Sequence, residues 1–142
     1  MIALLDANLL IALFDAAHVD HQRAHAWMSA NRTHGWATCP LTENACIRIM
    51  SQSSYPGRLT VEDIAGRLHR ATQAADHHFW PDDIRLTDVT KFDHSMMQNS
   101  KHLTDNYLLA LAVHHAGCLV TFDTGIQIQA ISGATTQHLV FV

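Results

Sequence analysis

Four acidic residues stand at equivalent places beside the predicted strands and helices of this chain. Two of them follow an apolar run that is typical of a buried strand, and two come directly after a threonine that can cap a helix. The first pair is Asp6 and Asp123, and the second pair is Glu43 and Asp105. In an open parallel sheet, the carboxyl ends of the strands and the beginnings of the following helices border one crevice. We therefore expect the four carboxylates to converge on one pocket.

A pocket lined by four carboxylates needs a counter-charge. Clustered carboxylates in apolar surroundings repel one another and lose solvation, so either some bind protons or a cation neutralises the group. Hard oxygen ligands favour Mg²⁺, with Mn²⁺ as a substitute, over zinc. One or two such ions can activate water for attack on a phosphodiester and stabilise the leaving oxygen. The residues therefore predict a metal-dependent hydrolase site.

Each acid also has a purely structural interpretation. Asp6 could be a turn residue at the end of a strand, and Asp123 could begin a tight turn with Gly125. Glu43 and Asp105 could be ordinary first-turn acids that the helix dipole stabilises. The recurrence of acids at four equivalent places favours the metal site over four separate structural roles.

The elements that must position these acids alternate between strands and helices. Apolar runs predict strands at residues 2–5, 35–39, 84–87, 118–122 and 139–142. Helical periodicity and capping residues predict helices at 9–14, 18–30, 42–51, 61–75 and 105–116, with a short helical piece at 92–98. This pattern predicts an α/β fold with a mostly parallel central sheet covered by helices on both faces. A chain of 142 residues can bury one such core, so we expect one domain over residues 1–142.

The composition excludes some classes of protein. The apolar opening is too short to cross a bilayer and no export signal follows, so we expect a cytoplasmic protein without a membrane partner. The three cysteines show no metal-binding spacing and are expected to be buried apolar residues. A formal net charge of −4 argues against coating nucleic acid by bulk electrostatics. The net charge does not exclude RNA binding through a few local arginines. Two interpretations, an RNA-facing rim or ordinary solvated surface, are open for Arg48, Arg58, Arg67 and Arg70.

Histidine is abundant, with 12 residues in the chain. His18, His21 and His25 lie along one stripe of a predicted helix, where either a soft-metal site or an exposed polar face is conceivable. The pairs His77–His78 and His114–His115 are adjacent in sequence. We expect the members of each pair to point apart and to chelate poorly.

The segments around the four acids resemble the PIN-domain family and, within it, the VapC toxins. The likeness is carried by Leu-Leu-Asp-Ala-Asn at residues 4–8, Pro-Leu-Thr-Glu at 40–43, Leu-Thr-Asp-Asn-Tyr-Leu at 103–108 and Val-Thr-Phe-Asp-Thr-Gly at 120–125. These segments stand in the family's order and at its usual separations. The likeness as a whole covers essentially the entire chain. One departure is Thr124, where many relatives carry a basic residue.

The resemblance assigns roles to six residues. It implies that the metal-binding and catalytic acids are Asp6, Glu43, Asp105 and Asp123. It also implies that Asn8 and Thr121 orient the carboxylates or water from a supporting layer. The family further implies a sheet order of 3-2-1-4-5, a homodimer, cleavage of tRNA or ribosomal RNA, and inhibition by a co-expressed antitoxin. The resulting hypothesis is a Mg²⁺-dependent endoribonuclease that acts as the toxin of a toxin–antitoxin pair.

Two other functions stay open at this point. One is a housekeeping PIN nuclease for RNA maturation, which an upstream antitoxin gene would argue against. The other is a non-catalytic module that merely holds a cation, as receiver domains do. Receiver domains carry a lysine after a late strand, whereas Lys91 and Lys101 both precede the predicted strand at 118–122. A haloacid-dehalogenase-like phosphatase is disfavoured, because Asn8 stands where that chemistry needs a second acid.

Overall fold

Five short strands form the central sheet of the structure, a computed structural model that describes residues 1–142. In chain order the strands are β1 (Ala3–Leu5), β2 (Trp36–Thr38), β3 (His77–Phe79), β4 (Cys118–Thr121) and β5 (Leu139–Phe141). Their spatial order is β3-β2-β1-β4-β5, and all neighbouring pairs are parallel. The α/β fold class and the sheet order of the sequence analysis are therefore confirmed.

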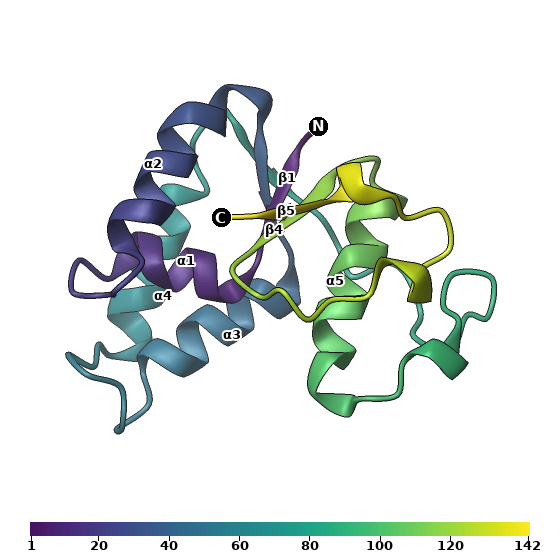
Figure 1. The fold of residues 1–142 in the computed structure, drawn as a ribbon. Coiled ribbons are helices and arrows are strands. Elements are labelled where there is room, and N and C mark those ends of the chain that lie inside the picture. The colour runs from purple at the N-terminus through teal and green to yellow at the C-terminus, as the bar shows by residue number, and fades with distance from the viewer.

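Five α-helices pack around the sheet. They are α1 (Ala7–Phe14), α2 (His21–Asn31), α3 (Pro40–Met50), α4 (Val61–Ala71) and α5 (Leu103–His114). Figure 1 shows α1 to α4 on one side of the sheet and α5 on the other. None of these helices combines the length and the apolar character that a bilayer crossing requires.

Side chains of β1 alternate between two separate hydrophobic clusters. Ala3 and Leu5 pack in a cluster with residues of α1 to α4, whereas Leu4 packs in a cluster with α5. This alternation is the period of two that a β-strand imposes on its side chains. Because both faces are covered, β1 is apolar throughout and buried at all three positions.

Helix α5 is buried on nearly every side. Seven consecutive residues, from Asn106 to Ala112, are buried. The sheet covers one side of the helix, and the segments that carry Phe92, Ile126 and Ile131 belong to the same hydrophobic cluster. A helix that is apolar all round is held by packing rather than by its own propensity. Its first turn, which carries Asp105, is therefore firmly placed.

The third strand lies elsewhere than predicted. The sequence analysis expected a strand at residues 84–87, but β3 is His77–Phe79 and residues 84–87 form no strand. β3 is an edge strand that is partly exposed, so its sequence lacks the apolar run of a buried strand. Ile84 is buried for another reason, since it packs against α5 and its carbonyl accepts a hydrogen bond from the hydroxyl of Tyr107 at 3.1 Å.

Several helix boundaries also differ from the prediction. The piece expected at 92–98 is only a single 3₁₀ turn, His94–Met96, and α2 begins at His21 rather than at residue 18. Helix α3 begins at Pro40, whose missing N–H suits the first helical position. The three cysteines are buried and unpaired, as expected.

Gly117 permits the close approach between the turn after α5 and the first strand. A Cβ atom at this position would lie 2.4 Å from the Ile2 carbonyl oxygen and 2.5 Å from the Trp80 ring. We expect Gly117→Ala to lower the free energy of unfolding by about 1–3 kcal/mol, because backbone and a buried ring must move. Urea denaturation followed by circular dichroism measures this change.

Gly66 provides the matched control. It lies in α4, where a Cβ would meet only the Arg70 side chain at 3.5 Å. Gly66→Ala should raise the free energy of unfolding by about 0.5–1 kcal/mol, because alanine is the better helix former. Equal effects of the two substitutions would contradict the steric role of Gly117.

Candidate active site

Asp6 stands directly after β1 and caps the beginning of α1. Its Oδ1 accepts a hydrogen bond from the backbone N–H of Ala7 at 2.7 Å, and its Oδ2 accepts one from the hydroxyl of Thr121 at 2.7 Å. Only 6% of the residue is exposed. Burial raises the pKa of Asp6, and these two hydrogen bonds oppose that shift. The carboxylate is therefore held in one orientation at the carboxyl end of β1.

Thr121 links Asp6 to Asp123, the next acid at the carboxyl end of the parallel strands. It is the last residue of β4 and is completely buried. Besides donating to Asp6, its hydroxyl oxygen accepts a hydrogen bond from the backbone N–H of Asp123 at 3.0 Å. One hydroxyl thus fixes both the Asp6 carboxylate and the backbone that carries Asp123.

Asp105 and Asp123 are neighbouring carboxyl groups that affect each other's pKa. Burial, together with the charges of Asp6 and Asp123, raises the pKa of Asp105 to about 6. The pKa of Asp123 is lowered, chiefly because its Oδ1 accepts a hydrogen bond from the backbone N–H of Gly125 at 2.8 Å. Asp123 therefore carries the negative charge while Asp105 retains a proton more readily. Asp6, Asp105 and Asp123 are thus brought together, as the sequence predicted.

Glu43 follows β2, the neighbour of β1 in the sheet, and is held separately from these three acids. It stands in the first turn of α3, and its Oε1 accepts a hydrogen bond from the hydroxyl of Thr38 at 2.7 Å. The same hydroxyl oxygen lies 2.8 Å from Nε2 of His77. Burial lowers the pKa of this histidine. No hydrogen bond or ion pair joins Glu43 to Asp6, Asp105 or Asp123. The carboxylate is oriented by the end of β2 rather than by the other acids.

His102 is a site residue that the sequence analysis missed. Its Nδ1 lies 3.6 Å from Oδ2 of Asp105 and 3.8 Å from Oδ2 of Asp123. This nitrogen is buried and has no hydrogen-bond partner. The available signal was spacing, because His102 precedes Asp105 by three residues and therefore lies one helical turn from it. Gly125 leaves room for this ring, since a Cβ there would lie 2.6 Å from it.

The two residues predicted to support the acids differ in their contacts. Thr121 hydrogen-bonds directly to Asp6, as described above. Asn8 is exposed and makes no hydrogen bond to any of the four carboxylates. The supporting role of Asn8 stays a prediction.

The residues at this edge fit a divalent cation. Asp105 and Asp6 are carboxyl groups whose charged forms are destabilised by burial. The buried Nδ1 of His102 and the buried Oδ1 of Asn106 both lack hydrogen-bond partners. A cation would stabilise the charged carboxylates and could satisfy such unpartnered atoms, directly or through water. An oxygen-rich set of this kind is the chemistry that Mg²⁺ and Mn²⁺ prefer.

A cavity of about 350 Å³ adjoins the acids. His102, Asn106 and Gly125 form part of its wall on the side of the carboxylates. All of the other lining residues are polar or carry a thioether; they are Ser95, Met96, Met97, Gln98, Asn99 and Gln127. The cavity therefore offers hydrogen-bonding groups to a molecule that reaches the acidic cluster.

The three histidines of the predicted stripe do not converge on one point, and only His21 and His25 lie on α2. Nδ1 of His18 accepts a hydrogen bond from the Asp20 backbone N–H at 3.0 Å. Nδ1 of His21 lies 2.7 Å from the Ala12 carbonyl, and Nε2 of His25 lies 3.1 Å from the carbonyl of residue 13. The three rings are thus directed at different backbone groups, and their nitrogens do not meet within 4.8 Å of one another, so the structure favours the polar-face interpretation of this stripe.

Known proteins resemble the chain over nearly its whole length. Residues 3–131 match the family model of the PIN domain. The chain is 46% identical to ribonuclease VapC44 of Mycobacterium tuberculosis over 139 residues, which are 98% of each protein. It is 41% identical to ribonuclease VapC39 of the same organism over 134 residues, which cover 94% of this chain and 96% of that protein.

A solved structure agrees with these relatives. The crystal structure of M. tuberculosis VapC20, described as a sarcin-ricin loop cleaving toxin, superposes with a TM-score of 0.64 at 10% sequence identity. The superposition covers 87% of this chain and 91% of that one, so the two proteins share their fold. Family model, relatives and fold agree: the chain belongs to the PIN-domain family and is a VapC-like member of it.

Proposed function

We propose that this protein is a Mg²⁺-dependent endoribonuclease and the toxin of a VapBC-type toxin–antitoxin pair. The observation that carries the proposal is the convergence of Asp6, Asp105 and Asp123, in which burial and repulsion raise the pKa of Asp105 to about 6. Such a group has a strong requirement for a cation. The identity to ribonucleases VapC44 and VapC39 supports RNA as the substrate of this chemistry.

In this proposal, some residues of the site bind the metal ion and others hold those ligands in position. Asp6, Glu43, Asp105 and Asp123 would hold Mg²⁺, or Mn²⁺ in its place. The bound ion supplies activation of water and stabilisation of charge on the leaving oxygen of the phosphodiester. Thr121 and the Ala7 amide keep the Asp6 carboxylate in position, and Thr38 does the same for Glu43. These hydrogen bonds preorganise the ligands, so little rearrangement is needed when the ion binds.

RNA would reach the acids along the polar cavity beside them. The amide side chains of Gln98, Asn99 and Gln127 can donate to phosphate and accept from bases. Four exposed arginines offer further phosphate contacts; they are Arg48, Arg58, Arg67 and Arg70. We propose a structured RNA of the tRNA or ribosomal class as the substrate.

The proposed partners follow from the VapC relationship. We propose a homodimer in the cytoplasm, and a cognate antitoxin that inhibits the enzyme by filling the active-site groove. A housekeeping role in RNA maturation is the alternative, and an antitoxin gene next to this one would argue against it. A non-catalytic cation-binding module is the other alternative, and the following experiment distinguishes it.

Asp105→Asn should abolish cleavage, because it removes a ligand charge while preserving the size of the side chain. We would incubate partner-free protein with total bacterial RNA in Mg²⁺, in Mn²⁺ and in EDTA, and map the new 5′ ends. Discrete cuts should appear only with metal. The variant should be at least about 100-fold slower, the order of loss that follows when a group that stabilises transition-state charge is removed.

Asp63→Asn is the matched control, since Asp63 is an exposed first-turn acid of α4. It should cleave at the wild-type rate. Full activity of Asp105→Asn, or cuts that persist in EDTA, would overturn the mechanism. No cleavage under any condition would favour the non-catalytic module.

The raised pKa of Asp105 also predicts how stability depends on pH without metal. The folded-state pKa is about 6 against 3.8 for the free side chain, so the folded state binds this proton more tightly. Stability contributed by the protonated carboxyl is present below pH 3.8 and is lost as pH rises to about 6. Asp105→Asn lacks this loss, so its melting temperature in EDTA should exceed that of wild type by a margin that grows over this range.

Melting curves of the same two proteins in excess Mg²⁺ test whether a cation reverses the destabilising effect of the charged Asp105 carboxylate. The ion binds the charged carboxylate, so it should raise the wild-type melting temperature above pH 6 more than that of the variant. A variant that is less stable than wild type in EDTA at neutral pH would show that the carboxylate is not under repulsion.

A further inference from the structure

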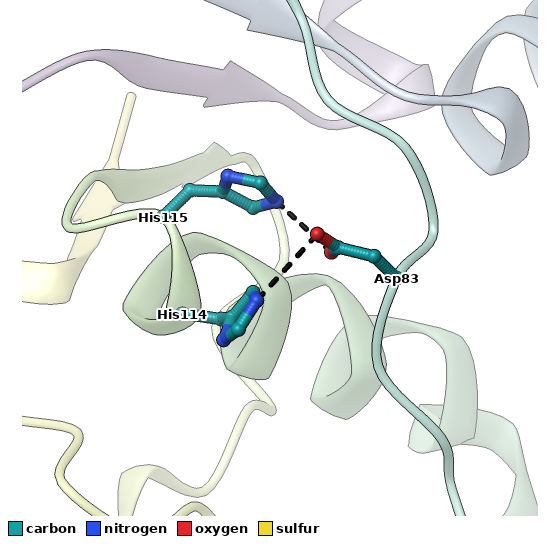
Figure 2. Close-up of side chains that lie close together, drawn as sticks. All are labelled: Asp83, His114 and His115. Carbon is teal, nitrogen blue, oxygen red and sulfur yellow. Dashed lines mark hydrogen bonds and ion pairs between the residues drawn. The ribbon is translucent and has the colours of Figure 1, made fainter.

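A second group of metal-binding side chains lies at the opposite end of α5 from Asp105. Figure 2 shows the imidazoles of His114 and His115 directed at the carboxylate of Asp83. Nε2 of His115 lies 3.0 Å from Oδ1 of Asp83, and Nε2 of His114 lies 3.5 Å from Oδ2. One ligand atom from each of the three residues lies within 4.8 Å of the other two. The three side chains thus surround one point.

This arrangement corrects the expectation that adjacent histidines point apart. Helix α5 ends at His114, and His115 is its C-cap, with φ −90° and ψ 13°. Two neighbouring positions at a helix end are offset around the axis but do not face opposite ways, so long side chains can reach one point between them. The carboxylate of Asp83, which belongs to the segment after β3, lies at that point.

We propose that Asp83, His114 and His115 form a surface site for a divalent transition metal of borderline softness, of which Zn²⁺ is the type. Two imidazole nitrogens and one carboxylate oxygen are a set that zinc accepts, with water in the fourth position. Tetrahedral ligands at about 2.1 Å from the ion are about 3.4 Å from one another. The two observed carboxylate–imidazole separations, 3.0 Å from Oδ1 to His115 and 3.5 Å from Oδ2 to His114, lie near this value, and one ligand atom from each residue lies within 4.8 Å of the others.

The surroundings prepare these side chains for a cation. The His115 ring stacks on the buried Trp80 ring, with centroids 4.7 Å apart and planes 11° from parallel, which limits its rotation. Burial would raise the pKa of Asp83, but the hydrogen bond from His115 and the charges of both histidines outweigh it and lower that pKa. The carboxylate is therefore charged at neutral pH. The end of α5 adds the negative pole of the helix dipole.

Lys91 competes with a metal ion for His114, in addition to the hydrogen bond between His115 and Asp83 that an ion would replace. Its ammonium nitrogen lies 3.5 Å from Nδ1 of His114. When Nε2 binds a metal, the neutral ring carries its proton on Nδ1, which then cannot accept from Lys91. The flexible lysine side chain must therefore swing away before His114 can act as a ligand, and this requirement weakens the site.

A bound ion would join two segments that lie far apart in the sequence. Asp83 belongs to the long connection between β3 and α5, whereas the histidines belong to the end of α5. A ligand that binds the folded state alone stabilises it by mass action. Zinc should therefore raise the melting temperature, independently of whether the acidic site cleaves RNA.

The test is zinc binding by isothermal titration calorimetry, with full-length protein at pH 7.5 in excess Mg²⁺ to fill the acidic site. We expect one Zn²⁺ per chain and a rise in melting temperature. His115→Gln and His114→Gln should each weaken zinc binding by about tenfold or more, since each removes a direct ligand. His114 is exposed, so its variant tests the site without disturbing the stacking on Trp80.

Two further variants separate this site from other histidines. His69→Gln alters an exposed histidine near the end of α4 and should bind zinc as wild type does. His102→Gln alters the acidic site and should also retain the zinc. Unchanged zinc binding by His114→Gln and His115→Gln would overturn the proposal, as would zinc binding that is lost only in His102→Gln.

Discussion

Repulsion between carboxylates at one edge of the sheet is the constraint on which the rest of the site depends. Asp6, Asp105 and Asp123 come from three separate elements, and each acts on the others through space. Folding must hold these like charges together in partly buried positions, which is unfavourable without a counter-charge. The cost is met by a two-sided hydrophobic core, which covers both faces of the sheet and encloses α5. Packing throughout the core thus stabilises the folded state, whereas the unfavourable repulsion is confined to the site, where a bound cation can relieve it.

Hydrogen bonds fix the orientation of two of these carboxylates, whereas the protonation of the third depends mainly on burial and on neighbouring charges. Asp6 receives a backbone N–H and the Thr121 hydroxyl, and Asp123 receives the Gly125 N–H. Asp105 accepts no backbone hydrogen bond, so burial and repulsion act on it with little compensation. The site therefore contains two preset carboxylates and one whose charge depends most on its surroundings. The charge of Asp105 therefore responds more strongly to a bound cation than that of Asp6.

The sequence predicted those parts of the structure whose physical cause is local. Apolar strands followed by acids located Asp6 and Asp123 at the sheet edge, and first-turn positions located Glu43 and Asp105. β3 was misplaced because an edge strand with exposed positions has no apolar run to reveal it. His102 was missed because its proximity to Asp123 depends on how the end of β4 meets α5, which no spacing along the chain encodes. The ring directions of His114 and His115 likewise depend on Asp83, which lies 31 and 32 residues away in the sequence.

Helix α5 connects two sites with different ligand chemistry. Asp105 in its first turn and His114 at its last residue lie about 14 Å apart along the helix axis at the usual rise per residue. The acidic end offers mainly carboxylate oxygens, which suit Mg²⁺ and Mn²⁺, and the other end offers two imidazoles, which suit zinc. Zinc binds oxygen ligands as well, so ligand type alone does not keep it out of the acidic end. An imidazole pair with higher zinc affinity would take up scarce zinc first. On this argument, the second site would leave the acidic cluster to the more abundant Mg²⁺.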